Sequence, residues 1–317
     1  MNAPDAYRLS RYLTAKKSID GRALNHRVWS RFVEELGGVS SLRILEVGAG
    51  VGATVERIVT ALDVRTGPSL RYTLVDRNPA VLDTASSELR TWAEQQGFEV
   101  TGRSPQVWSA DGESVALEFV TTDLYDFAAA HDGGGFDAIV GQALFDLLRI
   151  PDAIQALRPL LRDRGLWYLP IHFDGVTAFE PPHDSGLDGR VETLYHESMT
   201  TDHDDGRAGD QSGRRLLTHL RDAGSTLLEA GGSDWIVWPQ DGDYPADEAY
   251  FLYTFCTSLK TSFAATRPST MTRLRTGCRI AAARFTKAGL STSPINWTCW
   301  PDRTERFYPL KSGASST

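Results

Sequence analysis

Residues 42–52 constrain the fold more than any other stretch of the chain. Residues 42–47 form a short apolar run, the length of a buried parallel strand, and three glycines follow at every second position. Residues 53–62 then place apolar side chains at helical spacing, so the glycines lie between a strand and a helix N-terminus. A Cβ there would obstruct both the turn and the approach of a ligand to the backbone amides. The stretch predicts the first strand-turn-helix unit of a doubly wound α/β fold that binds a nucleotide.

The glycine spacing alone fits more than one class of nucleotide-binding enzyme. Gly48, Gly50 and Ala53 also match the G-x-G-x-x-G/A pattern of dinucleotide-binding dehydrogenases. Glu46 separates the two, because a carboxylate at the end of an apolar strand is costly unless it has a role beside a ligand. With Glu46, the sequence Glu-Val-Gly-Ala-Gly-Val-Gly resembles motif I of the class I, Rossmann-like S-adenosylmethionine-dependent methyltransferases. The resemblance implies that this loop, with its acid and Gly52, surrounds the methionine part of the cofactor.

The ends of the next two strands carry further acids. Residues 70–75 form a second strand ending in Asp76, whose carboxylate can accept both ribose hydroxyls of a nucleotide; the alternative is a solvated turn residue. By the resemblance, Arg77 lies near the adenine. Residues 97–115 are read as a hairpin-like excursion before a third strand at 116–121. Asp123 then stands where the family carries its adenine-contacting acid, with Leu124 over a ring face. Asp126 competes with Asp123, and either could cap a turn.

The fourth and fifth strands are expected at residues 136–140 and 166–171. In the family, the end of strand four faces the methionine group and the reacting centre, so Gln142 and Asp146 are candidates there. Gln142 could hold the substrate or the amino-acid part of the cofactor, or it could bond to the backbone at a helix entry. His172 ends strand five at the ligand-binding edge of the sheet and is the first candidate for a general base.

The N-terminal segment reads as one helix that begins at Asp20, with apolar residues recurring every fourth position until residues 37–38. Class I methyltransferases often place N-terminal residues over the cofactor, so Tyr7, Tyr12 and Lys16 could close the site. Solvent exposure is nevertheless the favoured interpretation for Lys16 and Lys17.

Residues 173–212 lack convincing periodicity and are expected to form a loop or lid over the active site. Its histidines, His183 and His196, are further candidate bases, and Asp174 and Tyr195 are candidate substrate contacts. We expect no metal, because the chain has neither an H-x-x-x-H helix nor a calcium loop.

The C-terminal third departs from the minimal fold of the family. We expect a sixth core strand at residues 227–238, two cap helices at 247–265 and 269–287, and a seventh strand at 290–300. The first of these helices is rich in aromatic residues, including Tyr250, which either pack in a core or line a substrate cavity.

Bulk properties narrow the choice of partners. The net charge of −8 disfavours a nucleic-acid substrate, and three widely spaced cysteines suit neither a disulfide framework nor a metal site. Without an apolar leader or a long uncharged apolar stretch, the chain is expected to be cytoplasmic and not a membrane protein. A homodimer is left open. The chain also carries no phosphate-binding P-loop and no nucleophile elbow.

The sequence therefore predicts a doubly wound seven-stranded, mostly parallel α/β sheet of the Rossmann-like methyltransferase type with an α-helical cap. The expected function is methyl transfer from S-adenosyl-L-methionine to an O or N atom of a small-molecule metabolite, which yields S-adenosyl-L-homocysteine. The alternatives are a nicotinamide-dependent oxidoreductase and a non-catalytic protein that binds S-adenosylmethionine. The expected segments are 1–39, N-terminal cap; 40–172, cofactor-binding core; 173–212, lid insertion; 213–240, core continuation; 241–289, helical cap insertion; 290–310, final strand; and 311–317, flexible tail.

The expected site residues fall into three groups. The cofactor-binding residues are Glu46, Gly48, Ala49, Gly50, Gly52, Asp76, Arg77, Asp123, Leu124 and Gln142. The substrate-binding residues are Tyr12, Gln142, Asp146, Asp174, Tyr195 and Tyr250. The candidate bases are His172, His183 and His196.

Overall fold

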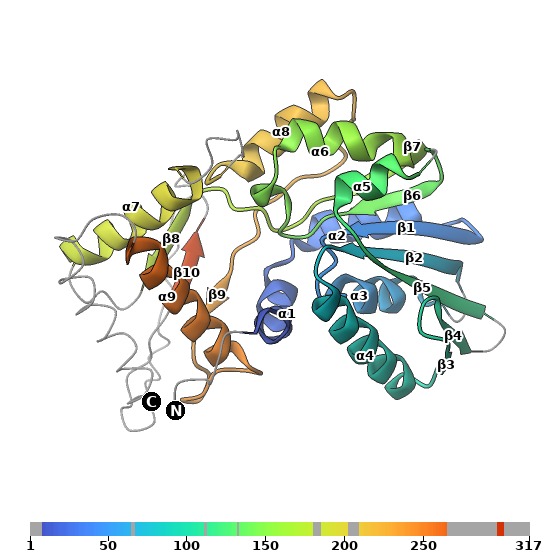
Figure 1. Cartoon of the computed structure of the whole chain (residues 1–317), viewed down its shortest axis with the longest axis horizontal. Helices are drawn as coiled ribbons and strands as arrows, with labels where there is room; N and C mark the ends of the chain where they lie inside the picture. Colours follow the sequence, from blue (N-terminus) through green and yellow to red (C-terminus); the bar gives the residue numbers. More distant parts are fainter. Residues whose placement is uncertain are drawn as a thin grey trace, which may run out of the picture.

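A seven-stranded sheet lies at the centre of the α/β core, with the strand order β3-β4-β5-β2-β1-β6-β7 (Figure 1). The computed structural model describes residues 8–64, 67–110, 113–131, 133–179, 185–201, 209–264 and 297–300. The strands of this sheet are β1 (Ser41–Val47), β2 (Ser69–Asp76), β3 (Glu99–Thr101), β4 (Gln106–Ala110), β5 (Glu113–Thr121), β6 (Phe136–Val140) and β7 (Leu161–Tyr168).

Five strands of the sheet are parallel, and two form an antiparallel edge. β5, β2, β1, β6 and β7 pair in parallel, whereas β3 and β4 add an antiparallel hairpin beside β5. Ile44 and Leu45 of β1 are fully buried in two different hydrophobic clusters, because successive side chains of a strand point to opposite faces. Helices therefore cover both faces, and the expected doubly wound, mostly parallel sheet with an edge hairpin is confirmed.

The helices divide between the two faces of the sheet and the cap. Phe32, Ile58 and Leu89 place α2, α3 and α4 over one face, and Phe127, Ile154 and Leu216 place α5, α6 and α8 over the other. Helices α1, α7 and α9 lie in or beside the cap (Figure 1). The helices are α1 (Leu9–Ala23), α2 (His26–Leu36), α3 (Ala53–Leu62), α4 (Pro79–Gln95), α5 (Leu124–Ala129), α6 (Ile150–Leu157), α7 (Ser185–Thr201), α8 (Ser212–Asp222) and α9 (Glu248–Ala264), with short turns η1 (Phe145–Leu147) and η2 (Arg158–Leu160).

The N-terminal segment forms two helices rather than the single helix expected from Asp20. Asp20 lies inside α1, and the chain is extended at Leu24 before α2 begins. Asn25 caps α2, since its Oδ1 accepts the N–H groups of Arg27 at 3.1 Å and Val28 at 3.2 Å. The four-residue apolar repeat continues across this break, so periodicity alone did not reveal it.

The expected sixth and seventh strands do not join the central sheet. Among the described residues, only β9 (Ile236–Val237) and β10 (Trp297–Trp300) are strands in those segments, and they form a separate antiparallel sheet in the order β8-β10-β9. Its third member, β8 (Val176–Phe179), comes from the segment expected to be a loop. The placement of strands six and seven was wrong because β8 provides a hydrogen-bonding edge in the cap that the sequence did not reveal.

The other C-terminal expectations have mixed outcomes. Residues 173–212 contain the helix α7 as well as β8, so this segment is more regular than expected. Helix α9 confirms the first of the two expected cap helices. Three expectations lie outside the described residues: the second cap helix, His183 as a base, and the tail at 311–317.

Replacing Asn25 by alanine should destabilise the protein. The change removes both cap bonds and the bond from Nδ2 to the carbonyl of Gly232, 2.9 Å away. We expect the free energy of unfolding, measured by urea denaturation, to fall by about 1–2 kcal/mol. Arg31→Ala, which breaks only exposed ion pairs on the same helix, should change it by less than about 0.5 kcal/mol. A loss at Asn25 no larger than that of the control would contradict the capping role.

Candidate functional site

The glycine loop after β1 has a backbone conformation that depends on glycine. Gly48, Gly50 and Gly52 have φ values of 63°, 56° and 72°, in the left-handed region that other residues rarely adopt. Space is limited as well, since a Cβ on Gly52 would lie 2.7 Å from Cδ1 of Leu89. The loop leads directly into α3, so the helix-end amides face the carboxyl edge of the sheet.

Asp76 joins the end of β2 to this loop. Its Oδ2 accepts the N–H of Gly50 at 3.0 Å, and its Oδ1 accepts the N–H of Asn78 at 2.9 Å. Each carboxylate oxygen has two lone pairs, so both oxygens keep acceptor capacity for a ligand. The carboxylate is therefore held beside the glycine loop in a fixed orientation. The neighbouring Arg77 is exposed.

Glu46 is buried beneath the loop, with 2% of its surface exposed. The hydroxyl of Tyr72 donates to its Oε2 at 2.8 Å. Burial raises the pKa of Glu46 to about 7, although hydrogen bonds from Tyr72 and Thr54 and the charge of Arg57 oppose the shift. The acid at the end of β1 thus takes part in a hydrogen-bonded network below the loop.

A chain of polar side chains links this region to the N-terminal helix. Arg57 Nη2 donates to Gln142 Oε1 at 2.6 Å, and Gln142 Nε2 donates to Asp20 Oδ2 at 2.8 Å. Lys16 Nζ lies 3.0 Å from the same oxygen of Asp20. Gln142, which directly follows Gly141 at the end of β6, therefore connects α3 with α1 through side-chain bonds.

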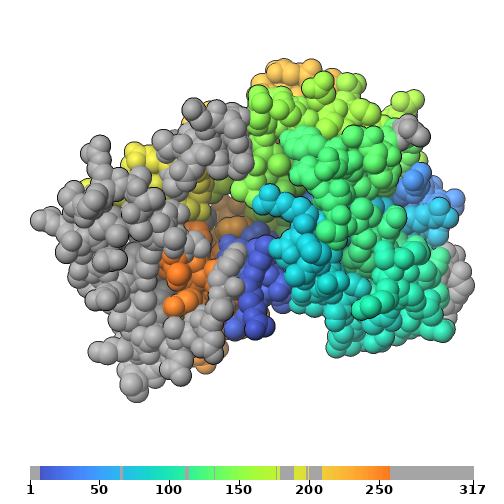
Figure 2. All heavy atoms as spheres, viewed as in Figure 1, coloured from blue at the N-terminus to red at the C-terminus, as the bar shows by residue number. Residues whose placement is uncertain are grey.

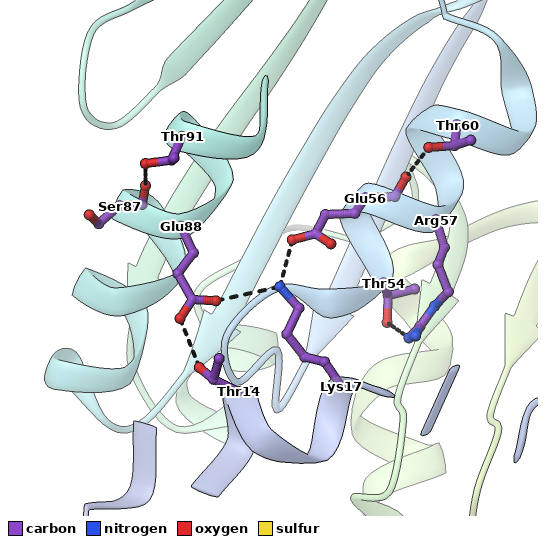
Figure 3. A network of polar contacts seen from close by, with 9 residues as sticks. All are labelled: Thr14, Lys17, Thr54, Glu56, Arg57, Thr60, Ser87, Glu88 and Thr91. Carbon is purple, nitrogen blue, oxygen red and sulfur yellow. Dashed lines mark hydrogen bonds and ion pairs between the residues drawn. The ribbon is translucent and has the colours of Figure 1, made fainter. Parts of the chain in front are cut away.

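Helix α1 is held from both sides by acidic residues. On the core side, Lys17 Nζ lies 2.6 Å from Glu56 of α3 and 3.4 Å from Glu88 of α4 (Figure 3). On the cap side, Arg22 pairs with the fully buried Glu248 of α9. The expectation that Lys16 and Lys17 are solvated was wrong: Lys16 is 7% exposed, and 22% of the Lys17 side chain is exposed.

Two positions near β5 have local structural roles. Asp123 caps α5, since its Oδ1 accepts the N–H of Tyr125 at 2.8 Å. Leu124 is 7% exposed and packs in the hydrophobic cluster beneath α5. That Asp123 and Leu124 contact an adenine ring stays a prediction.

His172 and Asp146 meet where the ends of β6 and β7 adjoin. His172 Nδ1 lies 3.8 Å from Asp146 Oδ1, and only 2% of the histidine side chain is exposed. In the described part of the chain, neither ring nitrogen nor Asp146 Oδ1 has a hydrogen-bond partner. The ring packs edge-on against Phe145, with 5.7 Å between the centroids. A buried imidazole with unpaired nitrogens beside a carboxylate is an arrangement suited to proton transfer.

The other residues expected in the lid have partners of their own. His196 Nε2 accepts the N–H of Thr177 at 3.1 Å, and burial lowers the pKa of His196. Asp174 pairs with Arg214 of α8 at 2.6 Å. Tyr195 packs edge-on against Phe255, with 5.3 Å between the centroids. His196 is therefore less suited to be a base than His172.

Tyr12 and Tyr250 lie in the contact between α1 and the cap. Tyr12 stacks on Phe251 with 5.2 Å between the centroids. The hydroxyl of Tyr250 accepts the N–H of Arg8 at 3.0 Å, and its ring lies beneath Arg11. Since Tyr250 is only 4% exposed, these contacts support core packing of this aromatic side chain.

Sequence reasoning missed Asp20 as a site residue. It was read as a helix cap, whereas it lies within α1 and contacts Gln142. The signal available was the i,i+4 spacing of Lys16 and Asp20, which allows an ion pair on one helix face.

Neither a metal cluster nor a membrane span is present in the part of the chain that the structure describes. No group of three or more His, Cys, Asp or Glu side chains converges there as a metal site would require. None of the described helices has the length and apolar character needed to cross a bilayer.

Comparison with solved structures finds methyltransferases of similar fold. An S-adenosylmethionine-dependent methyltransferase from Thiobacillus denitrificans, in complex with S-adenosyl-L-homocysteine, is 12% identical (TM-score 0.43; 93% of this chain and 97% of that chain covered). A Geobacter sulfurreducens S-adenosylmethionine-dependent methyltransferase, also bound to S-adenosyl-L-homocysteine, is 13% identical (0.42; 91% and 95%). A putative type II methyltransferase from Anaeromyxobacter dehalogenans is 17% identical (0.44; 87% and 94%).

No model of a protein family matches the chain, and no curated protein matches it. Since the structural neighbours have low identities and TM-scores, a functional assignment depends on the residues of this chain.

Glu46 should make the stability of the protein depend on pH. Its pKa is raised from an ordinary value of 4.5 to about 7, so the folded state binds more protons between these values and stability falls as pH rises through this window. From about pH 5 to pH 8, the wild type should lose up to about 3 kcal/mol more than Glu46→Gln in urea denaturation. Glu118→Gln, at an exposed position of β5, should keep the wild-type profile. Parallel profiles for wild type and Glu46→Gln would contradict the shift.

Proposed function

We propose that this chain is an S-adenosylmethionine-dependent methyltransferase that methylates an O or N atom of a small-molecule metabolite. The observation that carries the proposal is the bond between Asp76 and the N–H of Gly50, which holds beside a glycine loop a carboxylate that could accept the hydroxyls of a ribose. In parallel α/β sheets, this edge is where the ribose and the polar groups of a nucleotide bind. The three positive-φ glycines keep Cβ atoms out of the loop, so the residues present fit such a cofactor.

The nicotinamide-dependent oxidoreductase is the second choice, because it would use the same glycine loop and the same carboxylate at the end of β2. Glu46 favours the methyltransferase, since the sequence Glu-Val-Gly-Ala-Gly-Val-Gly resembles motif I of that family.

S-adenosylmethionine supplies an electrophilic methyl group on a positively charged sulfur. The lone pair of the acceptor forms the new bond to carbon as the carbon–sulfur bond breaks, and the electron pair stays on sulfur. The protein's task is to align the acceptor with that bond and to exclude water. The cap supports this, since α1 and α9 pack together beside the carboxyl edge, where Figure 2 shows a hollow between the blue and orange helices and the green and cyan core. The net charge of −8 supports a small molecule over nucleic acid.

His172 is the base that we assign to this reaction. Nδ1 is the ring nitrogen that faces Asp146, which leaves Nε2 to accept the proton from an acceptor O–H or N–H. The proton moves to Nε2 as the acceptor's lone pair attacks the methyl carbon. Once the ring has taken up the proton, the Asp146 carboxylate, 3.8 Å from Nδ1, offsets its positive charge.

Asp76→Ala should weaken cofactor binding. We expect calorimetry to show micromolar binding of S-adenosyl-L-homocysteine by the wild type and an affinity about 10- to 100-fold lower in the variant, because a charge-assisted hydrogen bond is lost. Asp83→Ala, on the exposed face of α4, is the matched control and should bind as the wild type does. Binding of NAD without binding of S-adenosyl-L-homocysteine would replace this proposal with the oxidoreductase.

Removal of the proposed base should affect turnover without affecting cofactor affinity. With an acceptor identified by a methylation screen, we expect His172→Ala to lower kcat about 100-fold or more and Asp146→Asn to lower it less. Both variants should bind S-adenosyl-L-homocysteine within about 2-fold of the wild type. Unchanged kcat in His172→Ala would rule out this base, and the absence of methylation of any acceptor would support a non-catalytic binding protein.

A further inference from the structure

Asp20 is a buried carboxylate with one oxygen unused. Its side chain is 6% exposed. Lys16 Nζ and Gln142 Nε2 both contact Oδ2, at 3.0 Å and 2.8 Å. Oδ1 is inaccessible to solvent and has no hydrogen-bond partner within the described residues. A buried carboxylate oxygen without a donor is costly, so Oδ1 is suited to a ligand that brings an N–H or O–H group.

Asp20 faces the same side of α1 as the residue that covers the glycine loop. Leu13, Lys16 and Asp20 follow the i, i+3, i+7 spacing of one helix face. These three side chains form a stripe along α1. At its start, Cδ1 of Leu13 lies 3.5 Å from the position that a Cβ on Gly50 would take. At its end, Asp20 bonds to Gln142, which follows β6. The stripe therefore runs along the carboxyl edge from β1 to β6, the crevice where the cofactor is proposed to lie.

A second unpaired polar group lies near Lys16. Lys16 Nζ is 4.6 Å from the centroid of the Trp235 ring, and the Trp235 indole Nε1 is buried without a partner among the described residues. An indole N–H can only donate, so it requires an acceptor such as a carboxylate. The positive charge of the nearby Lys16 ammonium group also favours a carboxylate at this position. One unpaired acceptor and one unpaired donor, both on side chains close to the Lys16 ammonium group, match the two ends of an α-amino acid.

We propose that Asp20 and Trp235 bind the amino-acid end of the methyl donor, with its ammonium group on Asp20 Oδ1 and its carboxylate on Trp235 Nε1 beside Lys16. The inference rests on the proposed function and adds to it that α1 and the segment before β9 are part of the cofactor site. Binding of the donor then joins the N-terminal helix, the cap segment and the core around one ligand. Asp76 is the residue assigned to the nucleoside part, so the two parts of the donor can be tested separately.

The experiment compares S-adenosyl-L-homocysteine with 5′-methylthioadenosine, which keeps the nucleoside and the sulfur but lacks the amino-acid end. The double variant Lys16→Met/Asp20→Asn removes the ion pair as a unit, so no buried charge is left unpaired. We expect its affinity for S-adenosyl-L-homocysteine, by calorimetry, to fall about 10- to 100-fold and its affinity for 5′-methylthioadenosine to change less than about 3-fold. Trp235→Phe keeps an aromatic ring and should show the same selectivity with a smaller loss.

Arg11→Gln is the matched control on α1. It breaks the exposed pair with Asp247 and should leave both affinities unchanged. Thermal unfolding of each variant verifies that it is folded. Equal losses for the two ligands, or unchanged affinity for S-adenosyl-L-homocysteine, would overturn the inference while leaving the proposed function in place. A wild-type protein that binds neither ligand would overturn the proposed function and this inference with it.

Discussion

The buried polar chain from Lys16 through Asp20 and Gln142 to Arg57 is the connection on which the arrangement of core and cap depends. It crosses from the N-terminal helix to the end of β6 and on to the helix that follows the glycine loop. Buried polar groups require partners, because water is not available to replace them. α1 must therefore lie against the carboxyl edge in one orientation, and the glycine loop is covered as a result.

The charges on the surface of α1 extend this connection to both sides. On the core side, Lys17 faces acids of α3 and α4 (Figure 3). On the cap side, Arg11 pairs with Asp247, just before α9, and Arg22 pairs with Glu248, the first residue of α9. The pair of Arg11 with Asp247 is exposed, and pairs of this kind contribute little stability individually. Glu248 is different, because it is fully buried and has Ser18 and Arg22 as its partners. The pairs help to determine where the helix lies, whereas Ala15 and Ile19 bury apolar surface against the cap.

Glu46 shows how a motif residue can have a structural as well as a binding role. Its hydrogen bond to Tyr72 and its near-complete burial place it in the layer between the sheet and α3. A carboxylate there is costly in its ionised form, which raises its pKa. The hydrogen bonds of Glu46 therefore lie below the loop, while the backbone of the loop and Asp76 form the carboxyl edge above it.

The sequence alone determined the central sheet and the carboxyl edge where the glycine loop meets Asp76. Short-range patterns carry that information: the apolar run of β1, the glycines at 48, 50 and 52, and Asp76 at the end of β2 are each local in the chain, and parallel strands bring their carboxyl ends together by necessity. Tertiary structure alone decided the cap. Whether β9 and β10 join the central sheet or pair with β8 depends on which strand edge is available, and no local pattern encodes that choice. The burial of Lys16 and the position of Asp20 beside Gln142 likewise depend on contacts between residues 122 positions apart in the chain. Local periodicity specifies which face of a helix is apolar, but the partners of a charged side chain are determined by what the fold places opposite it.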